Sequence, residues 1–256
     1  MVKVVGVIRG EDLTYQRTGL DAVHTALQEM ADSGEVVNLI LARRDSDSED
    51  LGALCEQASS LGVDIIEVSD NDISRMAVGV VVGQDVPEAL ALVGRTPNGS
   101  LEEVLARGGL VWLLHGITYT GNAGFSVRTA EISGADAVII DGEFSHDERR
   151  NAERQSVRAH RFIPTLWRES SEVVTAAKAA GFRVLAIEDI GEVEPWDCDL
   201  TGNILCVVGS ERHGVPEWLL ESADEIIRLP MIGFVPSYNL QVAVSVVALE
   251  ALRQRR

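Results

Sequence analysis

The chain has 256 residues, enough for one large domain or two modest ones, and 46% of them are hydrophobic, which is ordinary for a globular protein. No apolar run is long enough to cross a membrane, so we expect a cytoplasmic location. The formal net charge of −18 disfavours long-range attraction of nucleic acid, and the charge balance is compatible with adaptation to a salt-rich cytoplasm or merely with codon bias.

The first hundred residues alternate between strand and helix patterns, which predicts a small α/β domain over residues 1–100. Strands are expected at residues 1–9, 36–41, 63–68 and 78–82, and helices at residues 20–30, 48–61 and 71–76. The segment 95–100, Arg-Thr-Pro-Asn-Gly-Ser, is rich in turn formers and is the best candidate for a domain boundary.

A second alternation of strands and helices fills residues 101–256. Strands are expected at residues 110–114, 137–140, 182–187, 204–208 and 225–229, and helices at residues 101–107, 124–133, 145–159, 169–180, 216–221 and 239–254. Because the strands are apolar runs separated by helices, they predict a mostly parallel sheet. The last helix is apolar on most of its faces, which favours a dimer interface.

Several common catalytic motifs are absent from the sequence. Neither half has the glycine-rich fingerprint of a dinucleotide site or a P-loop, and there is no GxSxG hydrolase elbow and no HExxH metal motif. The three cysteines lack the spacing of metal ligands. We therefore expect no metal, and thiols that are reduced and mostly buried.

Three segments of the second half combine glycines with polar residues near the carboxyl ends of predicted strands, where α/β proteins bind ligands. They are residues 121–131 with Asn122 and Arg128, residues 207–216 with Glu211, and residues 233–240 with Ser237 and Asn239. Taken singly, each segment is also compatible with helix capping or with an ordinary surface side chain. Their common order and spacing are far more specific.

In that order and spacing the chain resembles the SpoU/TrmH branch of the SPOUT methyltransferases. The family's first motif has the form N-x-G-x-x-x-R-T-A, matched here from Asn122 to Ala130. Its second motif, G-x-E-x-x-G, matches Gly209 to Gly214 and leads to a Leu-Pro-Met strand end. The third, of S-L-N type, precedes a final helix. The resemblance is strong over residues 108–256. More weakly, the first hundred residues resemble the L30e-like substrate-binding domain that often precedes this fold.

The resemblance implies an α/β SPOUT methyltransferase domain over residues 101–256 with a trefoil knot at its C-terminus, a homodimer, and S-adenosylmethionine as cofactor. Its activity would be methyl transfer to RNA, most often to a ribose 2′-oxygen of rRNA or tRNA. The implied cofactor-binding residues are Val208, Gly209, Ser210, Leu229, Met231, Tyr238, Asn239 and Leu240. The implied catalytic residues are Arg128, Asn122, Glu211, Ser237 and Asn239.

Arg128 could act in two ways in such a reaction. It could accept the proton of the ribose hydroxyl, or it could act as a cation that orients a phosphate or stabilises the developing alkoxide. The motifs also depart from the family pattern: Tyr238 replaces a leucine, and Tyr119, Thr120 and Gly121 replace an aspartate-proline lead-in. These departures leave open a small-molecule substrate or a non-catalytic RNA-binding module.

A group of arginines counters the acidic composition locally. Arg150, Arg154 and Arg158 recur at a spacing of four and would form one basic stripe on the helix predicted at residues 145–159. Such a stripe could neutralise RNA phosphates. The alternative is pairing with the acidic residues of the same helix, or contacts within a dimer.

Overall fold

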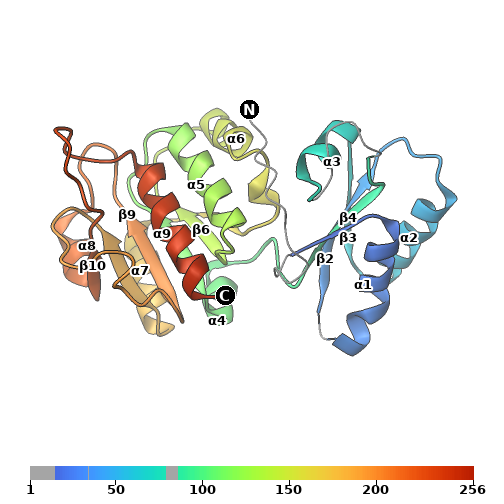
Figure 1. Cartoon of the computed structure of the whole chain (residues 1–256), viewed down its shortest axis with the longest axis horizontal. Coiled ribbons are helices and arrows are strands. Elements are labelled where there is room, and N and C mark those ends of the chain that lie inside the picture. Colours follow the sequence, from blue (N-terminus) through green and yellow to red (C-terminus); the bar gives the residue numbers. More distant parts are fainter. Residues whose placement is uncertain (1–14, 34, 79–85) are drawn as a thin grey trace. The chain divides into compact units, whose positions relative to one another are not determined.

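The computed structural model describes residues 15–33, 35–78 and 86–256, which belong to two compact units (Figure 1). The first unit spans residues 1–96 and the second residues 97–256, so the division lies inside the turn-rich segment 95–100. The strand expected at residues 1–9, and most of the strand expected at 78–82, lie outside the described residues. Within those described, no helix is long and apolar enough to cross a membrane.

The first unit contains a four-stranded sheet in the order β1-β4-β2-β3. Its elements are β1 (Gln16–Thr18), α1 (Leu20–Ser33), β2 (Val37–Arg43), α2 (Glu49–Ser60), β3 (Asp64–Val68), α3 (Asp70–Met76) and β4 (Ala89–Val93). β2 and β3 are parallel, whereas β4 is antiparallel to both β1 and β2. β1 and β4 were not among the expected strands. β4 is a short run without polar alternation, a pattern that does not separate a strand from a buried helix.

The second unit contains a six-stranded sheet in the order β10-β8-β9-β5-β6-β7, and every strand pair in it is parallel. Its strands are β5 (Leu110–Leu114), β6 (Ala137–Ile140), β7 (Thr165–Trp167), β8 (Arg183–Ile187), β9 (Ile204–Val208) and β10 (Glu225–Ile227). The predicted parallel sheet is therefore confirmed. Only the three-residue edge strand β7 was not expected.

Helices cover both faces of this sheet. They are α4 (Leu101–Arg107), α5 (Thr120–Ile132), α6 (His146–Gln155), α7 (Ser170–Ala179), α8 (Glu217–Ser222) and α9 (Leu240–Gln254). Successive side chains of a strand point to opposite faces. Trp112 and Leu114 of β5 therefore share a core with α5 and α9, whereas Val111 and Leu113 pack with α4, α7 and α8. Figure 1 shows α9 lying beside α5, against which it packs.

The helix predicted at residues 145–159 is shorter than expected. α6 ends at Gln155, and the chain then turns through Val157 and Arg158, whose φ angles are 53° and 67°. This turn leads into a short 3₁₀ helix, Ala159–Arg161, and brings Ala159 into the core. Arg158 therefore does not lie on the helix that carries Arg150 and Arg154, and the predicted stripe of three helical arginines is wrong.

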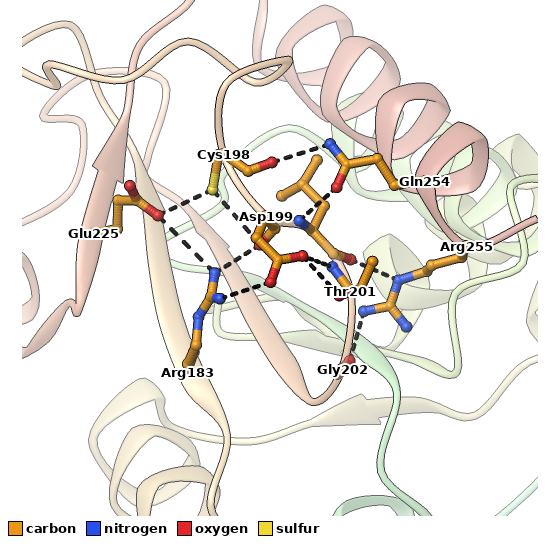
Figure 2. A network of polar contacts seen from close by, with 9 residues as sticks. Arg183, Cys198, Asp199, Thr201, Gly202, Glu225, Gln254 and Arg255 are labelled. Atoms are coloured by element: carbon orange, nitrogen blue, oxygen red, sulfur yellow. Dashed lines mark hydrogen bonds and ion pairs between the residues drawn. The ribbon is translucent and has the colours of Figure 1, made fainter.

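The end of the last helix is tied to the segment between β8 and β9, as Figure 2 shows. Gln254 Nε2 donates to the carbonyl of Cys198 at 3.0 Å, and its Oε1 accepts from the amide of Leu200 at 2.8 Å. Arg255 donates to the carbonyls of Leu200 and Gly202 at 2.8 and 2.6 Å. These contacts fix the C-terminus of the chain on the second unit. The trefoil knot implied by the resemblance stays a prediction.

The cysteines of the second unit are buried and unreactive. Burial, helped by a hydrogen bond to Glu225, raises the pKa of Cys198 to about 12, and burial raises the pKa of Cys206 to about 12. Both thiols are protonated at neutral pH, and only the thiolate is a good nucleophile. Cys55 of the first unit is partly exposed. Two of the three cysteines are buried, so the expectation of mostly buried thiols is confirmed.

Candidate active site

A cleft of about 830 Å³ opens at the carboxyl edge of the sheet in the second unit. The chain runs from β5 to β6 and β7 on one side, then crosses to β8 and inserts β9 between β8 and β5. The strand order thus reverses direction beside β5, and ligands of open α/β sheets bind at such a point. The segments that follow β5, β8, β9 and β10 all contribute to the walls of the cleft.

Most of the residues expected at the site meet in this cleft. All eight residues expected to bind the cofactor line it, namely Val208, Gly209, Ser210, Leu229, Met231, Tyr238, Asn239 and Leu240. Asn122, Glu211 and Ser237, of those expected to be catalytic, line it with Asn239. Arg128 is not among the lining residues.

Several lining residues had not been expected. They are Tyr119, Thr120, Gly121, Phe125, Ile187, Glu188, Asp189, Arg212, Gly214, Pro236 and Ala243. Glu188 and Asp189 directly follow the apolar run of β8, so their position at a strand end is the signal that could have identified them. Glu188 supports the neighbouring loop, because its carboxylate accepts the amide of Val215 at 2.9 Å.

Glu211 is the polar centre of the cleft. Its Oε1 accepts from Asn122 Nδ2 at 2.8 Å and from the amide of Tyr119 at 3.3 Å. Its Oε2 accepts from the amide and the hydroxyl of Thr118 at 3.2 and 3.1 Å. The carboxylate therefore holds the segment before α5 against the loop after β9.

These contacts also set the charge of Glu211. Burial by itself would raise the pKa of the carboxyl group, but the hydrogen bonds from Asn122, from the loop backbone and from Thr118 outweigh it and lower the pKa. Hydrogen bonds that stabilise the charged form have this effect. Glu211 is therefore a carboxylate at neutral pH and a hydrogen-bond acceptor.

Asn239 connects the third motif to the other two. Its Oδ1 accepts the amide of Gln241 at 2.9 Å, so it is the N-cap of α9, as expected from the sequence. Its Nδ2 donates to Asn122 Oδ1 at 3.2 Å. A continuous chain of hydrogen bonds thus runs from Asn239 through Asn122 to Glu211. This chain of side-chain hydrogen bonds connects three segments that are far apart in the sequence.

The loop after β9 can form only because position 209 is a glycine. Ser210 and Gly214 exchange two backbone hydrogen bonds, each 3.0 Å long, which fold the loop back on itself. A Cβ at Gly209 would lie 2.0 Å from the carbonyl carbon of Gly214, and backbone atoms there cannot move aside cheaply. The motif glycine therefore brings the loop backbone to the wall of the cleft.

Arg128 lies in the second half of α5, one turn beyond Phe125, which lines the cleft. Its side chain is partly exposed and makes no hydrogen bond or ion pair with any residue in the described ranges. On α6, Arg150 and Arg154 are exposed, and Arg149 stacks on the ring of Trp167 with its guanidinium carbon 4.6 Å from the ring centroid. α6 adjoins the lip of the cleft, because Asn151 donates to Thr120 Oγ1 at 2.8 Å.

Comparison with known proteins identifies the family. The SpoU rRNA Methylase family matches residues 109–249, more than half of the chain. The chain belongs to this family. A relative in Xylella fastidiosa, the 23S rRNA (guanosine-2′-O-)-methyltransferase RlmB, is 30% identical over 248 residues, which cover 93% of this chain and 95% of the relative. RlmB of Haemophilus influenzae is 27% identical over 247 residues, covering 95% and 99%.

Solved structures have the same fold. An AdoMet-bound rRNA methyltransferase from Sinorhizobium meliloti matches with a TM-score of 0.57 at 22% identity, covering 93% of this chain and 87% of that chain. The SpoU methyltransferase AviRb from Streptomyces viridochromogenes also matches with a TM-score of 0.57 at 22% identity, covering 94% and 89%. Family membership makes the chain an RNA methyltransferase that uses S-adenosylmethionine.

The cleft fits this cofactor. Its volume is in the range of small-molecule sites, and Ile187, Leu229 and Leu240 provide apolar surface for an adenine ring and a methionine chain. Glu188 and Asp189 give it negative charge, which favours a ligand carrying sulfonium and ammonium groups. Among the residues that the structure describes, no group of three or more His, Cys, Asp and Glu side chains could hold a metal ion.

Proposed function

We propose that this SpoU methylase transfers the methyl group to the ribose 2′-oxygen of a guanosine in 23S rRNA. The names of the relatives in Xylella and Haemophilus, which match nearly the whole chain, support this substrate. The observation that carries the proposal is the hydrogen-bonded chain Asn239–Asn122–Glu211, which joins the three family motifs at one cleft. Action on rRNA also supports a cytoplasmic location, where bacterial ribosomes assemble.

The residues divide into two groups by their chemistry. S-adenosylmethionine supplies an electrophilic methyl group, which the loop backbone around Gly209 and the side chains of Leu229 and Leu240 would hold. The polar group of Asn122, Glu211 and Ser237 faces the same cleft and would receive the ribose. Holding the two reactants in line is the main contribution such a site can make to a direct displacement.

Arg128 would act as a cation in this reaction. An arginine keeps its positive charge in proteins, so it is better suited to stabilise negative charge than to accept a proton. Arg128 lies one turn from Phe125, which lines the cleft, so its guanidinium would approach a substrate bound at that end of the cleft. It would then stabilise a phosphate or the oxygen that becomes negative as the ribose attacks.

We also propose a homodimer formed through α5 and α9. Both helices expose large apolar side chains: Phe125 and Ile132 on α5, and Val242, Val246 and Leu249 on α9. The three residues of α9 recur at spacings of four and three and form one stripe. Since α5 packs beside α9, the five side chains belong to neighbouring surfaces that a second copy could cover.

RNA binding would use the exposed arginines Arg150 and Arg154 of α6. This helix adjoins the lip of the cleft through the bond between Asn151 and Thr120, so phosphates on either side of the target nucleotide would be within its reach. Arg158 lies beyond the end of the helix and would act separately. A local basic surface is what an enzyme with net charge −18 needs to bind a polyanion.

The experiment that tests the function is methyl transfer from radiolabelled S-adenosylmethionine to unmodified 23S rRNA, 16S rRNA and tRNA, at low and high KCl. Nuclease digestion and chromatography then identify the labelled nucleotide. We expect 2′-O-methylguanosine from 23S rRNA. Label in another RNA or another nucleotide would refute the proposed substrate. Absence of label, with cofactor binding intact by calorimetry, would refute RNA methylation.

A further inference from the structure

Three aromatic side chains line the cleft, and two of them have other roles. Tyr238 donates its hydroxyl to the carbonyl of Pro230 at 3.0 Å and belongs to the third motif. Phe125 lies on the face of α5 proposed for the dimer. The third, Tyr119, is 53% exposed, and its hydroxyl has no hydrogen-bond partner among the residues described. Its ring is therefore available at the mouth of the cleft.

The backbone of Tyr119 is fixed although its ring is free. Its amide donates to Glu211 Oε1 at 3.3 Å, next to the bond that Asn122 makes to the same oxygen. The ring is thus attached at the point where the polar group of the site is assembled. An exposed aromatic ring on a fixed backbone loses little conformational freedom when a flat ligand packs on it.

A tyrosine is also unfavourable at the position that Tyr119 occupies in the helix. It is the N-cap of α5, and its side chain makes no capping hydrogen bond. Ser, Thr, Asp or Asn would stabilise the helix start at this position by about 0.5–2 kcal/mol. Residues that break a local rule in this way are concentrated at functional sites. The side chain of Tyr119 therefore has no capping role in α5.

We propose that the ring of Tyr119 stacks on the nucleobase of the nucleotide whose ribose is methylated. Proteins that read RNA outside a duplex commonly stack unpaired bases on exposed aromatic side chains. Stacking at Tyr119 would place the attached ribose beside Asn122 and Glu211, because Asn122 shares the start of α5 with the ring and Glu211 Oε1 accepts hydrogen bonds from Asn122 and from the amide of Tyr119. The inference rests on the proposed function, since it requires an RNA substrate.

Replacing the ring should weaken RNA use without weakening cofactor binding. Tyr119→Ala and Tyr119→Ser should lower kcat/KM for RNA by about tenfold to a hundredfold, in line with the loss of one stacked base. The affinity for S-adenosylmethionine, measured by calorimetry, should stay unchanged. Tyr119→Phe should restore most of the loss. Tyr119→Ser supplies a capping hydroxyl, so a loss in this variant is not explained by unfolding of α5.

A substrate without the base separates stacking from other roles of the ring. In a short RNA whose target nucleotide lacks its base but keeps its ribose, wild-type activity should fall to about the level of Tyr119→Ala. Tyr119→Ala should lose little further activity when the base is removed from its substrate.

The matched control is Trp196→Ala, which removes an aromatic side chain of similar exposure, 49%, outside the cleft. It should behave as wild type.

The two proposals fail in different ways. If the wild-type enzyme methylates no RNA, the proposed function is wrong. If the wild type methylates RNA but Tyr119→Ala and Tyr119→Ser have unchanged kinetics, stacking on Tyr119 is wrong and the function stands. Additive losses from the missing ring and the missing base would also overturn the stacking proposal.

Discussion

Replacing Glu211 by glutamine removes one negative charge but keeps the size of the side chain. The two carboxylate oxygens accept four hydrogen bonds, two on each oxygen. A glutamine amide has one accepting oxygen, and its NH₂ group would face donors at the other position. Glu211→Gln therefore loses at least two hydrogen bonds to a charged group.

The expected loss of stability follows from these contacts. Hydrogen bonds to charged groups contribute about 1.5–3 kcal/mol each when buried, so two would contribute about 3–6 kcal/mol. Glu211 is only partly buried, and solvent screening reduces this figure. We expect Glu211→Gln to lower the free energy of unfolding by about 1–3 kcal/mol at pH 7, and to lower kcat/KM for RNA because Asn122 loses its acceptor.

The pH dependence provides the stricter test. The pKa of Glu211 is lower in the folded protein than in the unfolded chain, where it is about 4.3. Its charge therefore contributes fully to stability above pH 4.3, and the contribution is lost as the pH falls through the lower folded-state value. The stability difference between wild type and Glu211→Gln should be constant near neutral pH and shrink below about pH 4.3.

Urea unfolding followed by tryptophan fluorescence measures this difference, at constant ionic strength, between about pH 3.5 and pH 7.5. All tryptophans, Trp112, Trp167, Trp196 and Trp218, lie in the second unit, so the signal reports on the part of the chain that contains the cleft. A difference that stays constant down to the lowest pH, or that is absent at pH 7, would refute the role assigned to the carboxylate.

Further predictions concern the arginine, the glycine loop, the dimer and the charge. Arg128→Ala should reduce methyl transfer by about a hundredfold or more while sparing cofactor affinity measured by calorimetry, and unchanged turnover would refute its role. Gly209→Ala should lower the free energy of unfolding by at least about 2 kcal/mol, because its Cβ would overlap the backbone of Gly214. The control is Gly121→Ala, whose Cβ would make only an ordinary van der Waals contact. It should change the free energy of unfolding by less than about 0.5 kcal/mol. Leu249→Glu should convert the dimer into a monomer, as measured by light scattering. The control Thr175→Glu, on the exposed side of α7, should remain a dimer. A dimer in both variants would exclude the α5–α9 face as the dimer interface. The melting temperature should rise between about 0.05 and 1 M KCl because the self-repulsion of 40 acidic residues is screened, and equal values would end the salt-adaptation hypothesis.

The amino-acid pattern alone predicts the class of the second unit, and the motifs identify half of the residues that line its cleft. Apolar runs such as 110–114 and 204–208 are buried on both faces, so their pattern alone predicts strands of a covered parallel sheet. The residues Asn122, Glu211 and Asn239 could be chosen because the three segments that contain them match the family's motifs in order and spacing. Local features such as the N-cap at Asn239 can also be predicted from the sequence, because capping depends on residues only two or three positions away.

How these parts meet depends on contacts between segments that are distant in the sequence. Asn122 is 89 residues from Glu211 and 117 from Asn239, and no local pattern brings them together; the insertion of β9 between β5 and β8 does. The same holds for α6, whose helical sequence pattern continues past Gln155 although the helix ends there and the chain turns at Val157 and Arg158. The two helices α5 and α6 pack closely at this point, since a Cβ at Gly124 would lie 2.4 Å from the carbonyl oxygen of Ala152. The position of Tyr119 at the cleft, too, follows from a hydrogen bond to a distant carboxylate, which periodicity does not encode.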